Sequence, residues 1–335
     1  MTTNTICLLP GDGIGLEVIP IATKILGVLD VGLMTENHPI GWECFNDTGQ
    51  ALPKSTLDAV VRSGVALFGA TSSPTGGAPG YSSPIIDLRQ QLNLYANVRP
   101  AQSLPVPSSR QNIDLLIIRE NTEGLYIRSE HWKDQDTVIA ERRITRAGSE
   151  RVARIAARYA LQRKGLLTIA HKSNVLSLSD GLFLQVARDT AMHCAPDIEV
   201  RDQLVDSLAH DLIIKPESYD VIVTPNMYGD IISDLTSALV GGLGVAPSAN
   251  VGDNCTIYEP VHGSAPDIVG KNLANPTATI MSLAMMLEDL GYVDASNRLN
   301  TELYNTLAAG IYTPDLGGEA TTETMFTSIL EKLTK

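Results

Sequence analysis

Short apolar runs alternate along this chain with longer segments in which apolar residues recur at helical spacing. A run of roughly four to eight apolar residues is typical of a strand buried on both faces, and the longer recurrence is typical of an amphipathic helix. The pattern predicts strands at residues 5–9, 65–68, 113–118, 166–170 and 220–224. It predicts helices at residues 17–29, 150–164, 181–192 and 277–290. Such alternation indicates an α/β protein with a largely parallel sheet.

Three segments break this alternation. Residues 71–84 are rich in Ser, Pro and Gly and lead into an amphipathic run at 85–94, which we expect to be helical. Residues 241–252 are rich in Gly, and residues 259–276 have no clear period. The chain contains no low-complexity tail, so we expect these irregular segments to be binding loops.

The size and charge of the chain limit its possible partners. Its 335 residues, 44% of them hydrophobic, exceed what one core usually organises, so we expect two domains. The formal net charge of −13 would repel a polyanion over most of the surface. Nucleic acid and anionic membranes are therefore not expected partners. An anionic substrate would need a local cluster of arginines.

The compartment can also be predicted. Four cysteines are scattered without metal-ligand spacing, which is typical of free thiols in a reducing compartment. The first residues lack a basic segment followed by an apolar run, and no stretch reaches the roughly 20 apolar residues that cross a bilayer. We therefore expect a cytoplasmic protein.

A glycine-rich turn follows the first predicted strand at residues 10–15 (PGDGIG). A dinucleotide-binding fingerprint would require a third glycine where this chain has Leu16. The spacing favours a tight strand-to-helix turn that needs a permissive backbone. Nucleotide binding by a different architecture stays open.

Three arginines, Arg89, Arg99 and Arg119, each follow an apolar stretch. The planar guanidinium can bind a carboxylate with two hydrogen bonds, and a strand end is where a cleft opens. Three such residues in an acidic protein favour a site for a polycarboxylate. The alternative is that each arginine pairs with an internal acid such as Glu120.

Asp230 and Asp234 lie four residues apart just after the strand predicted at 220–224. On a helix their carboxylates would be offset by roughly 40° and could share a hard cation. Asp206, which we place at the end of another predicted strand, could supply a third carboxylate. A helix cap and a solvated acid are the alternative for the pair.

Two further residues have the chemistry for proton transfer. Lys172 follows the strand predicted at 166–170, where a buried amine could act as a base, and Tyr126 could donate a proton. A solvated lysine and a packing tyrosine are the ordinary alternatives.

Together these motifs resemble the β-decarboxylating dehydrogenases, a family that includes isocitrate, 3-isopropylmalate, homoisocitrate and tartrate dehydrogenases. The resemblance covers essentially the whole chain, through LPGDGIG at 9–15, LYANVRP at 94–100, RENTEGLY at 119–126, GDIISD at 229–234, HGSAPDI at 262–268 and TPDLGG at 313–318. Leu16 replaces the proline usual in the family, and we expect this to affect only the first helical turn.

The resemblance implies an α/β, isopropylmalate dehydrogenase-like two-domain fold with a mixed, largely parallel sheet and no standard Rossmann fingerprint. Residues 1–98 and 241–335 would form the larger, cofactor-binding domain. Residues 99–240 would form the smaller domain with the dimer interface. The expected assembly is a homodimer with shared active sites, with a tetramer as the alternative.

The resemblance also implies the roles of individual residues. The catalytic residues would be Tyr126, Lys172 and Asp206. Mg²⁺ or Mn²⁺ would bind to Asp206, Asp230 and Asp234. The substrate would contact Ser73, Arg89, Arg99, Arg119, Tyr126, Lys172 and Asn174. Of these residues, Lys172, Asn174 and Asp206 would come from the partner subunit.

The cofactor implied is NAD, because a carboxylate at Asp267 would accept hydrogen bonds from free ribose hydroxyls and repel a 2′-phosphate. The NAD site would comprise Ile14, Thr71, Ser72, Asn174, Glu259, His262, Gly263, Ser264, Ala265, Asp267, Ile268 and Asn275.

The reaction implied is oxidation of a malate-type 2-hydroxy acid with loss of its β-carboxylate as CO₂. The segments at 80–89 and 171–183 look most like homoisocitrate dehydrogenases of lysine biosynthesis. Isocitrate, shorter by one methylene, is the close alternative. The serines at 73, 82 and 83 disfavour 3-isopropylmalate, although Ile86 leaves it open. A non-catalytic regulatory subunit is disfavoured because the chain keeps the catalytic and metal-binding set.

Overall fold

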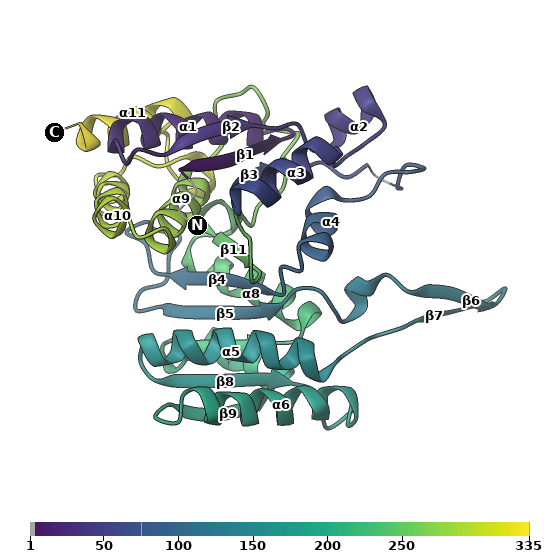
Figure 1. Ribbon diagram of the computed structural model, residues 1–335. Helices are drawn as coiled ribbons and strands as arrows, with labels where there is room; N and C mark the ends of the chain where they lie inside the picture. The colour runs from purple at the N-terminus through teal and green to yellow at the C-terminus, as the bar shows by residue number, and fades with distance from the viewer. Residues whose placement is uncertain (1–3, 75, 335) are drawn as a thin grey trace. The chain divides into compact units, whose positions relative to one another are not determined.

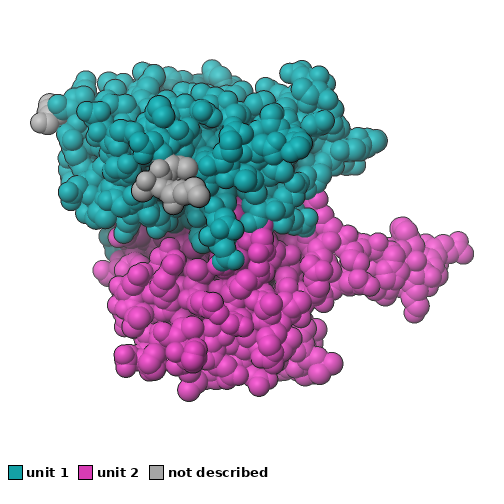
Figure 2. Space-filling view, viewed as in Figure 1, with its two compact units in different colours: residues 1–92, 104–111, 240–335 teal, residues 93–103, 112–239 magenta. Residues whose placement is uncertain are grey.

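The structure is a computed structural model that describes residues 4–74 and 76–334 (Figure 1). The chain forms two compact units, which are coloured separately in Figure 2. Unit 1 comprises residues 1–92, 104–111 and 240–335, and unit 2 comprises residues 93–103 and 112–239. The predicted division after residue 98 would cut strand β4 (Ala96–Gln102). In the structure the whole strand stays in unit 2 because it pairs along its length with β5 (Asp114–Glu120).

Unit 1 is built on strands in the order β2-β1-β3-β12-β11. Their bounds are Met34–Asn37, Thr5–Gly11, Val65–Ala70, Thr256–Pro260 and Pro247–Val251. All neighbours in this order are parallel except β11 and β12. The helices of the unit are α1 (Gly15–Leu29), α2 (Trp42–Thr48), α3 (Lys54–Ser63), α4 (Pro84–Gln91), α9 (Thr277–Asp289), α10 (Val293–Ala308) and α11 (Thr322–Leu333).

Unit 2 contains strands in the order β4-β5-β10-β8-β9, of which β10 is Val221–Thr224, β8 is Leu166–His171 and β9 is Glu199–Leu204. Among the neighbours in this order, only β4 and β5 run antiparallel. The helices are α5 (Arg146–Gln162), α6 (Ser179–Cys194), α7 (Val205–Ile214) and α8 (Asn226–Val240). A hairpin of β6 (Glu130–Asp134) and β7 (Thr137–Ala140) extends away from the rest of this unit (Figure 1).

The predicted α/β class is confirmed, and every predicted strand and helix overlaps an element of the same kind. Two details were wrong. The segment 241–252, expected to be a loop, contains strand β11. The strand predicted before Asp206 is present as β9, which ends at Leu204, but Asp206 itself lies in the first turn of helix α7. Burial of Leu208 and Leu212 one turn apart favours a helix from Val205 onward.

Among the described residues, none of the helices combines the length and apolar character that a bilayer crossing requires.

Candidate active site

In unit 2, the end of β5 and the start of α8 lie side by side. Strands β5 and β10 are parallel with Arg119 opposite Thr224, and α8 begins two residues after Thr224. Gly229 makes the close approach of the helix possible. A Cβ at this position would lie 2.7 Å from the Arg119 side chain and closer still to the Thr224 hydroxyl. Parallel pairing and one glycine therefore bring α8 against Arg119.

Arg119 is nearly fully buried, and its charge is balanced by Asp230 of α8. Its guanidinium donates to Asp230 Oδ1, and its Nε and Nη2 donate to Asn226 Oδ1 at 3.1 and 2.8 Å. The same guanidinium lies 4.9 Å from the centre of the Tyr126 ring. The Tyr126 hydroxyl donates to Asp230 Oδ2 at 2.5 Å. One carboxylate thus joins an arginine and a tyrosine that the sequence analysis assigned separately.

Arg99 on β4 contacts both acids of α8. Its Nη1 donates to Ser233 Oγ at 2.7 Å and to Asp234 Oδ1 at 3.4 Å, and it lies 3.5 Å from Asp230 Oδ1. Its Nε donates to the side chain of Asn97. The predicted helical arrangement of the two aspartates on one face is confirmed.

The acidic partners of the arginines differ from the one considered in the sequence analysis. Arg119 and Arg99 pair with Asp230 and Asp234. Glu120 instead accepts hydrogen bonds from the backbone N–H groups of Thr122 and Glu123.

Burial and charge shift two acidities in this cluster. Burial raises the pKa of Tyr126, and its hydrogen bond to Asp230 raises it further, so the phenol stays protonated at neutral pH. Burial also raises the pKa of Asp234, against the opposing effect of Arg99 and with a further contribution from Asp230. The two neighbouring carboxylates provide oxygen ligands of the kind that Mg²⁺ and Mn²⁺ prefer, so the donor set fits a hard cation.

Lys172 follows β8 directly, as predicted, and its Nζ contacts Asp206 on α7. The Lys172 hydrogen bond lowers the pKa of Asp206, assisted by a backbone N–H group. Among the described residues, no group of three His, Cys, Asp or Glu side chains is close enough to hold a metal. Asp206 is therefore not gathered with Asp230 and Asp234 inside a single chain. Asn174, in the same loop as Lys172, is exposed.

In unit 1, the turn after β1 packs on the segment 264–268. The Ile14 N–H donates to the Ser264 carbonyl at 3.0 Å, and Ile14 packs against Ala265 and Ile268. Ser72 and Ser264 share a hydroxyl hydrogen bond of 2.8 Å. Five of the residues predicted to bind the cofactor are thereby linked through Ser264 and the apolar cluster around Ile14.

Asp12 organises these loops, and the sequence analysis did not assign it a role. Its buried carboxylate accepts the N–H groups of Ser72, Trp42 and Glu43 at 2.8, 2.7 and 3.0 Å. In the sequence, the position of Asp12 between two glycines just after the first predicted strand could have indicated this structural role. Thr71 is half-buried and Ser73 is exposed in the irregular stretch after β3.

Arg89 lies on α4 and is buried against Glu259 at the end of β12. Its Nη2 donates to Glu259 Oε1 at 2.7 Å, and Asn250 Nδ2 donates to the same oxygen at 2.8 Å. Arg89 Nε and His262 Nε2 are buried without a hydrogen-bond partner. These two polar atoms could be satisfied by a bound ligand.

The remaining predicted cofactor residues lie in the segment between β12 and α9. Asn275 donates to Asp315 at 2.9 Å and accepts the Thr277 N–H at 3.0 Å. Burial lowers the pKa of His262, against the opposing effect of Asp315 and Glu259, so its imidazole is neutral at pH 7. Gly263 and Asp267 are exposed. The His262 Nδ1 lies 3.0 Å from the Gly263 carbonyl oxygen, so only Nε2 lacks a partner. This nitrogen and the exposed Asp267 carboxylate are compatible with a nucleotide ligand.

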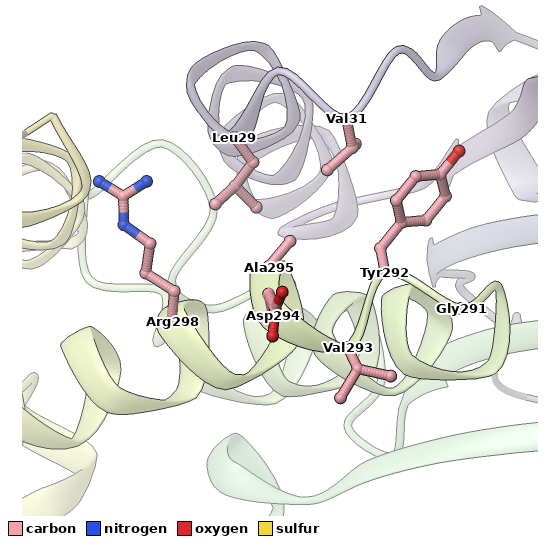
Figure 3. A pocket seen from close by; sticks show the side chains of 8 residues that line it. All are labelled: Leu29, Val31, Gly291, Tyr292, Val293, Asp294, Ala295 and Arg298. Atoms are coloured by element: carbon pink, nitrogen blue, oxygen red, sulfur yellow. The ribbon is translucent and has the colours of Figure 1, made fainter.

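A cavity of about 440 Å³ opens elsewhere in unit 1, between the end of α1 and the start of α10 (Figure 3). It is lined by Leu29, Val31, Gly291, Tyr292, Val293, Asp294, Ala295 and Arg298. None of these residues belongs to the predicted site, so this cavity is not the candidate active site.

The chain is similar to known proteins over nearly its whole length. The family model for isocitrate/isopropylmalate dehydrogenase matches residues 5–329. An isocitrate/homoisocitrate dehydrogenase of Thermus thermophilus is 49% identical over 329 residues, covering 98% of each chain. A homoisocitrate dehydrogenase of Methanocaldococcus jannaschii is 46% identical over 343 residues, also covering 98% of each chain. The crystal structure of an isocitrate dehydrogenase from Methylococcus capsulatus matches with a TM-score of 0.94 at 39% identity, covering 99% of both chains.

Proposed function

The chain belongs to the isocitrate/isopropylmalate dehydrogenase family, and from this premise we propose that it oxidises homoisocitrate with NAD and releases CO₂ to form 2-oxoadipate. A decarboxylating hydroxy-acid dehydrogenase is what family membership establishes, and the substrate and cofactor are our proposal. The observation that best supports it is the contact of Arg119, Asp230 and Tyr126. Their proposed roles are to bind a substrate carboxylate, to bind the metal and to donate a proton.

The proposed chemistry divides among the side chains of the chain. Arg89, Arg99 and Arg119 would bind substrate carboxylates with paired hydrogen bonds. Lys172 would accept the proton of the 2-hydroxyl group, and Tyr126, whose raised pKa keeps it protonated, would protonate the carbon that loses CO₂. When bound, NAD⁺ would accept the hydride, and Mg²⁺ or Mn²⁺ on Asp230 and Asp234 would stabilise negative charge on the substrate oxygen.

The segment that leads into α4 carries both polar and apolar groups. Ser82 donates to Asp87 Oδ1 at 2.7 Å, and Ile85 and Ile86 lie in the same first turn. The choice of homoisocitrate therefore rests on the similarity to relatives that are named for this substrate.

The substrate proposal is tested by measuring kcat/KM for homoisocitrate, isocitrate and 3-isopropylmalate with NAD and Mg²⁺. We expect homoisocitrate to be preferred over isocitrate by about tenfold or more, because one methylene contributes about 1–3 kcal/mol to discrimination. A tenfold preference for isocitrate would show that the proposed substrate is wrong, while the proposed reaction class would stand. Failure of all three acids would overturn the proposed function.

The cofactor proposal predicts the effect of Asp267→Lys. We expect kcat/KM for NAD to fall about tenfold or more and that for NADP to rise, because a charged hydrogen bond of about 1.5–3 kcal/mol is lost and the repulsion of a 2′-phosphate is removed. The control is Glu331→Lys, which makes the same charge change at an exposed residue of α11. Equal use of NAD and NADP by the unmodified protein would contradict the assignment.

A homodimer with shared sites completes the proposal. Large apolar side chains are exposed next to the predicted catalytic residues: Val175, Leu176 and Leu178 after Lys172, Ile213 and Ile214 on the helix of Asp206, and Met227 and Ile231 around Asp230. Leu178 is 87% exposed. Exposed apolar groups at this density support contact with another subunit.

A further inference from the structure

A buried carboxylate determines the position of the Lys172 main chain. Asp180 is in the first turn of α6 and is fully buried. Its Oδ2 accepts the Lys172 N–H at 2.6 Å. The Lys172 carbonyl accepts the N–H groups of Val175 and Leu176 at 3.0 and 2.9 Å, and the Asp180 N–H donates to the Leu176 carbonyl at 3.0 Å. Hydrogen bonds at both ends of the loop at 172–176 therefore attach the predicted base, Lys172, to Asp180.

Arg142 neutralises this buried carboxylate and connects it to the rest of the site. Its Nη1 donates to Asp180 Oδ1 at 2.5 Å and to Ser179 Oγ at 2.9 Å. Its guanidinium lies 5.4 Å from the ring centre of Tyr228, two residues before Asp230 on α8. The adjacent Arg143 exchanges backbone hydrogen bonds with Gly124, two residues before Tyr126. The Asp180–Arg142 ion pair is therefore connected to three segments of the site, those that bear Lys172, Asp230 and Tyr126.

His171 holds the other side of the loop. Its Nδ1 accepts the Ser173 N–H at 3.1 Å, and its Nε2 lies 3.1 Å from Asp202 Oδ2. Two successive N–H groups, those of Lys172 and Ser173, are therefore bound by side chains and not by the sheet. Of these two side chains, only Asp180 is also joined to the segments of Tyr126 and Asp230.

We infer that the Asp180–Arg142 ion pair is a positioning device for Lys172, which sets the place of its amine relative to the substrate hydroxyl. Asp180 is fully buried, so it would act on the reaction only through the loop at 172–176. The inference rests on the proposed role of Lys172 as the base. A displacement of about 1 Å in such a group can cost about 10²-fold in rate.

Asp180→Asn is the direct test. An asparagine replaces one of the two carboxylate oxygens by an NH₂ donor, so a donor would face either the Lys172 N–H or the Arg142 guanidinium. We expect kcat to fall about 10²-fold while KM changes less than about threefold, because the loss concerns placement of the base and not ground-state binding. Asp180→Glu, which keeps both acceptors and the charge, should recover part of the loss. Arg142→Gln, which leaves Asp180 in place, should also lower kcat. It replaces Asp180→Asn as the test if Asp180→Asn does not fold.

The chain offers a matched control at the opposite end of β8. Asp220 is also fully buried, pairs with Arg163 at 2.7 Å and accepts the Lys164 N–H at 2.9 Å. Asp220→Asn removes the same kind of ion pair without touching the Lys172 loop. We expect a lower Tm in both variants but a change in kcat below about twofold for Asp220→Asn.

A double variant tests whether the effect of Asp180 passes through Lys172. In a Lys172→Ala background, Asp180→Asn should cause no further loss of kcat, because the amine that it positions is missing. Equal losses in the two backgrounds, or wild-type kcat in Asp180→Asn, would overturn the inference.

Amide hydrogen exchange of residues 172–176 gives a result that does not depend on turnover. It should accelerate in Asp180→Asn and not in Asp220→Asn, and unchanged exchange in Asp180→Asn would overturn the inference. If the wild-type protein turned over none of the acids while exchange responded as expected, the proposed function would fail and the control of the loop by Asp180 would stand.

Discussion

With Asp230 replaced by Asn, we expect kcat at saturating Mg²⁺ to fall by about 10³-fold. Asp230 contacts Arg119, Arg99 and Tyr126 and is proposed as a metal ligand, so the substitution removes the negative charge offered to the cation and one of the two oxygens that accept from Arg119 and Tyr126. The loss corresponds to about 4 kcal/mol of transition-state stabilisation, within the several kcal/mol that a bound cation supplies.

This prediction is checked by measuring kcat against Mg²⁺ concentration and by following Tm with and without the metal. The variant should lose most of the Mg²⁺-induced rise in Tm. The control is Asp189→Asn, an exposed carboxylate of α6 outside the predicted site, which should keep the metal dependence of the wild type. If Asp230→Asn had the kcat of the wild type at the same Mg²⁺ concentration, the proposal that Asp230 is a metal ligand would be wrong.

Replacing Lys172 by Ala should lower kcat about 10²- to 10⁴-fold, the range for loss of a general base. The change should have little effect on folding, because the ion pair that it removes is formed with an exposed partner, Asp206. The measurement is kcat with homoisocitrate, NAD and Mg²⁺ as a function of pH.

Mixed dimers then show which subunit receives Lys172. In a dimer of one Lys172→Ala chain and one Asp230→Asn chain, a shared site would combine the intact Lys172 of one chain with the intact Asp230 of the other. Random pairing makes about half of the dimers mixed, each with one intact site of two, so about a quarter of wild-type activity should return. If Lys172 served the site of its own chain, both sites of the mixed dimer would be defective and no activity would return.

Contacts between distant residues account for what could not be predicted from sequence. The sequence suggested Glu120 as an example of an internal acid that could pair with Arg119, yet the partners of Arg119 are Asp230 and Asn226, more than one hundred residues away. That pairing depends on the parallel alignment of β5 with β10 and on the absence of a Cβ at Gly229. Asp12 was missed for a similar reason, since the backbone groups that it binds come from separate loops. Asp180 was missed because its ionic partner, Arg142, lies 38 residues away in the sequence.

Local periodicity and local geometry are what the amino-acid sequence determined by itself. The α/β alternation, the glycine turn at 10–15, the position of Lys172 directly after a strand and the common face of Asp230 and Asp234 all follow from spacings of a few residues. Only the tertiary structure decided which charges meet. Burying Arg119, Arg89 and Asp180 requires partners for their charges, and the order and register of the strands determine which side chains are near enough to supply them.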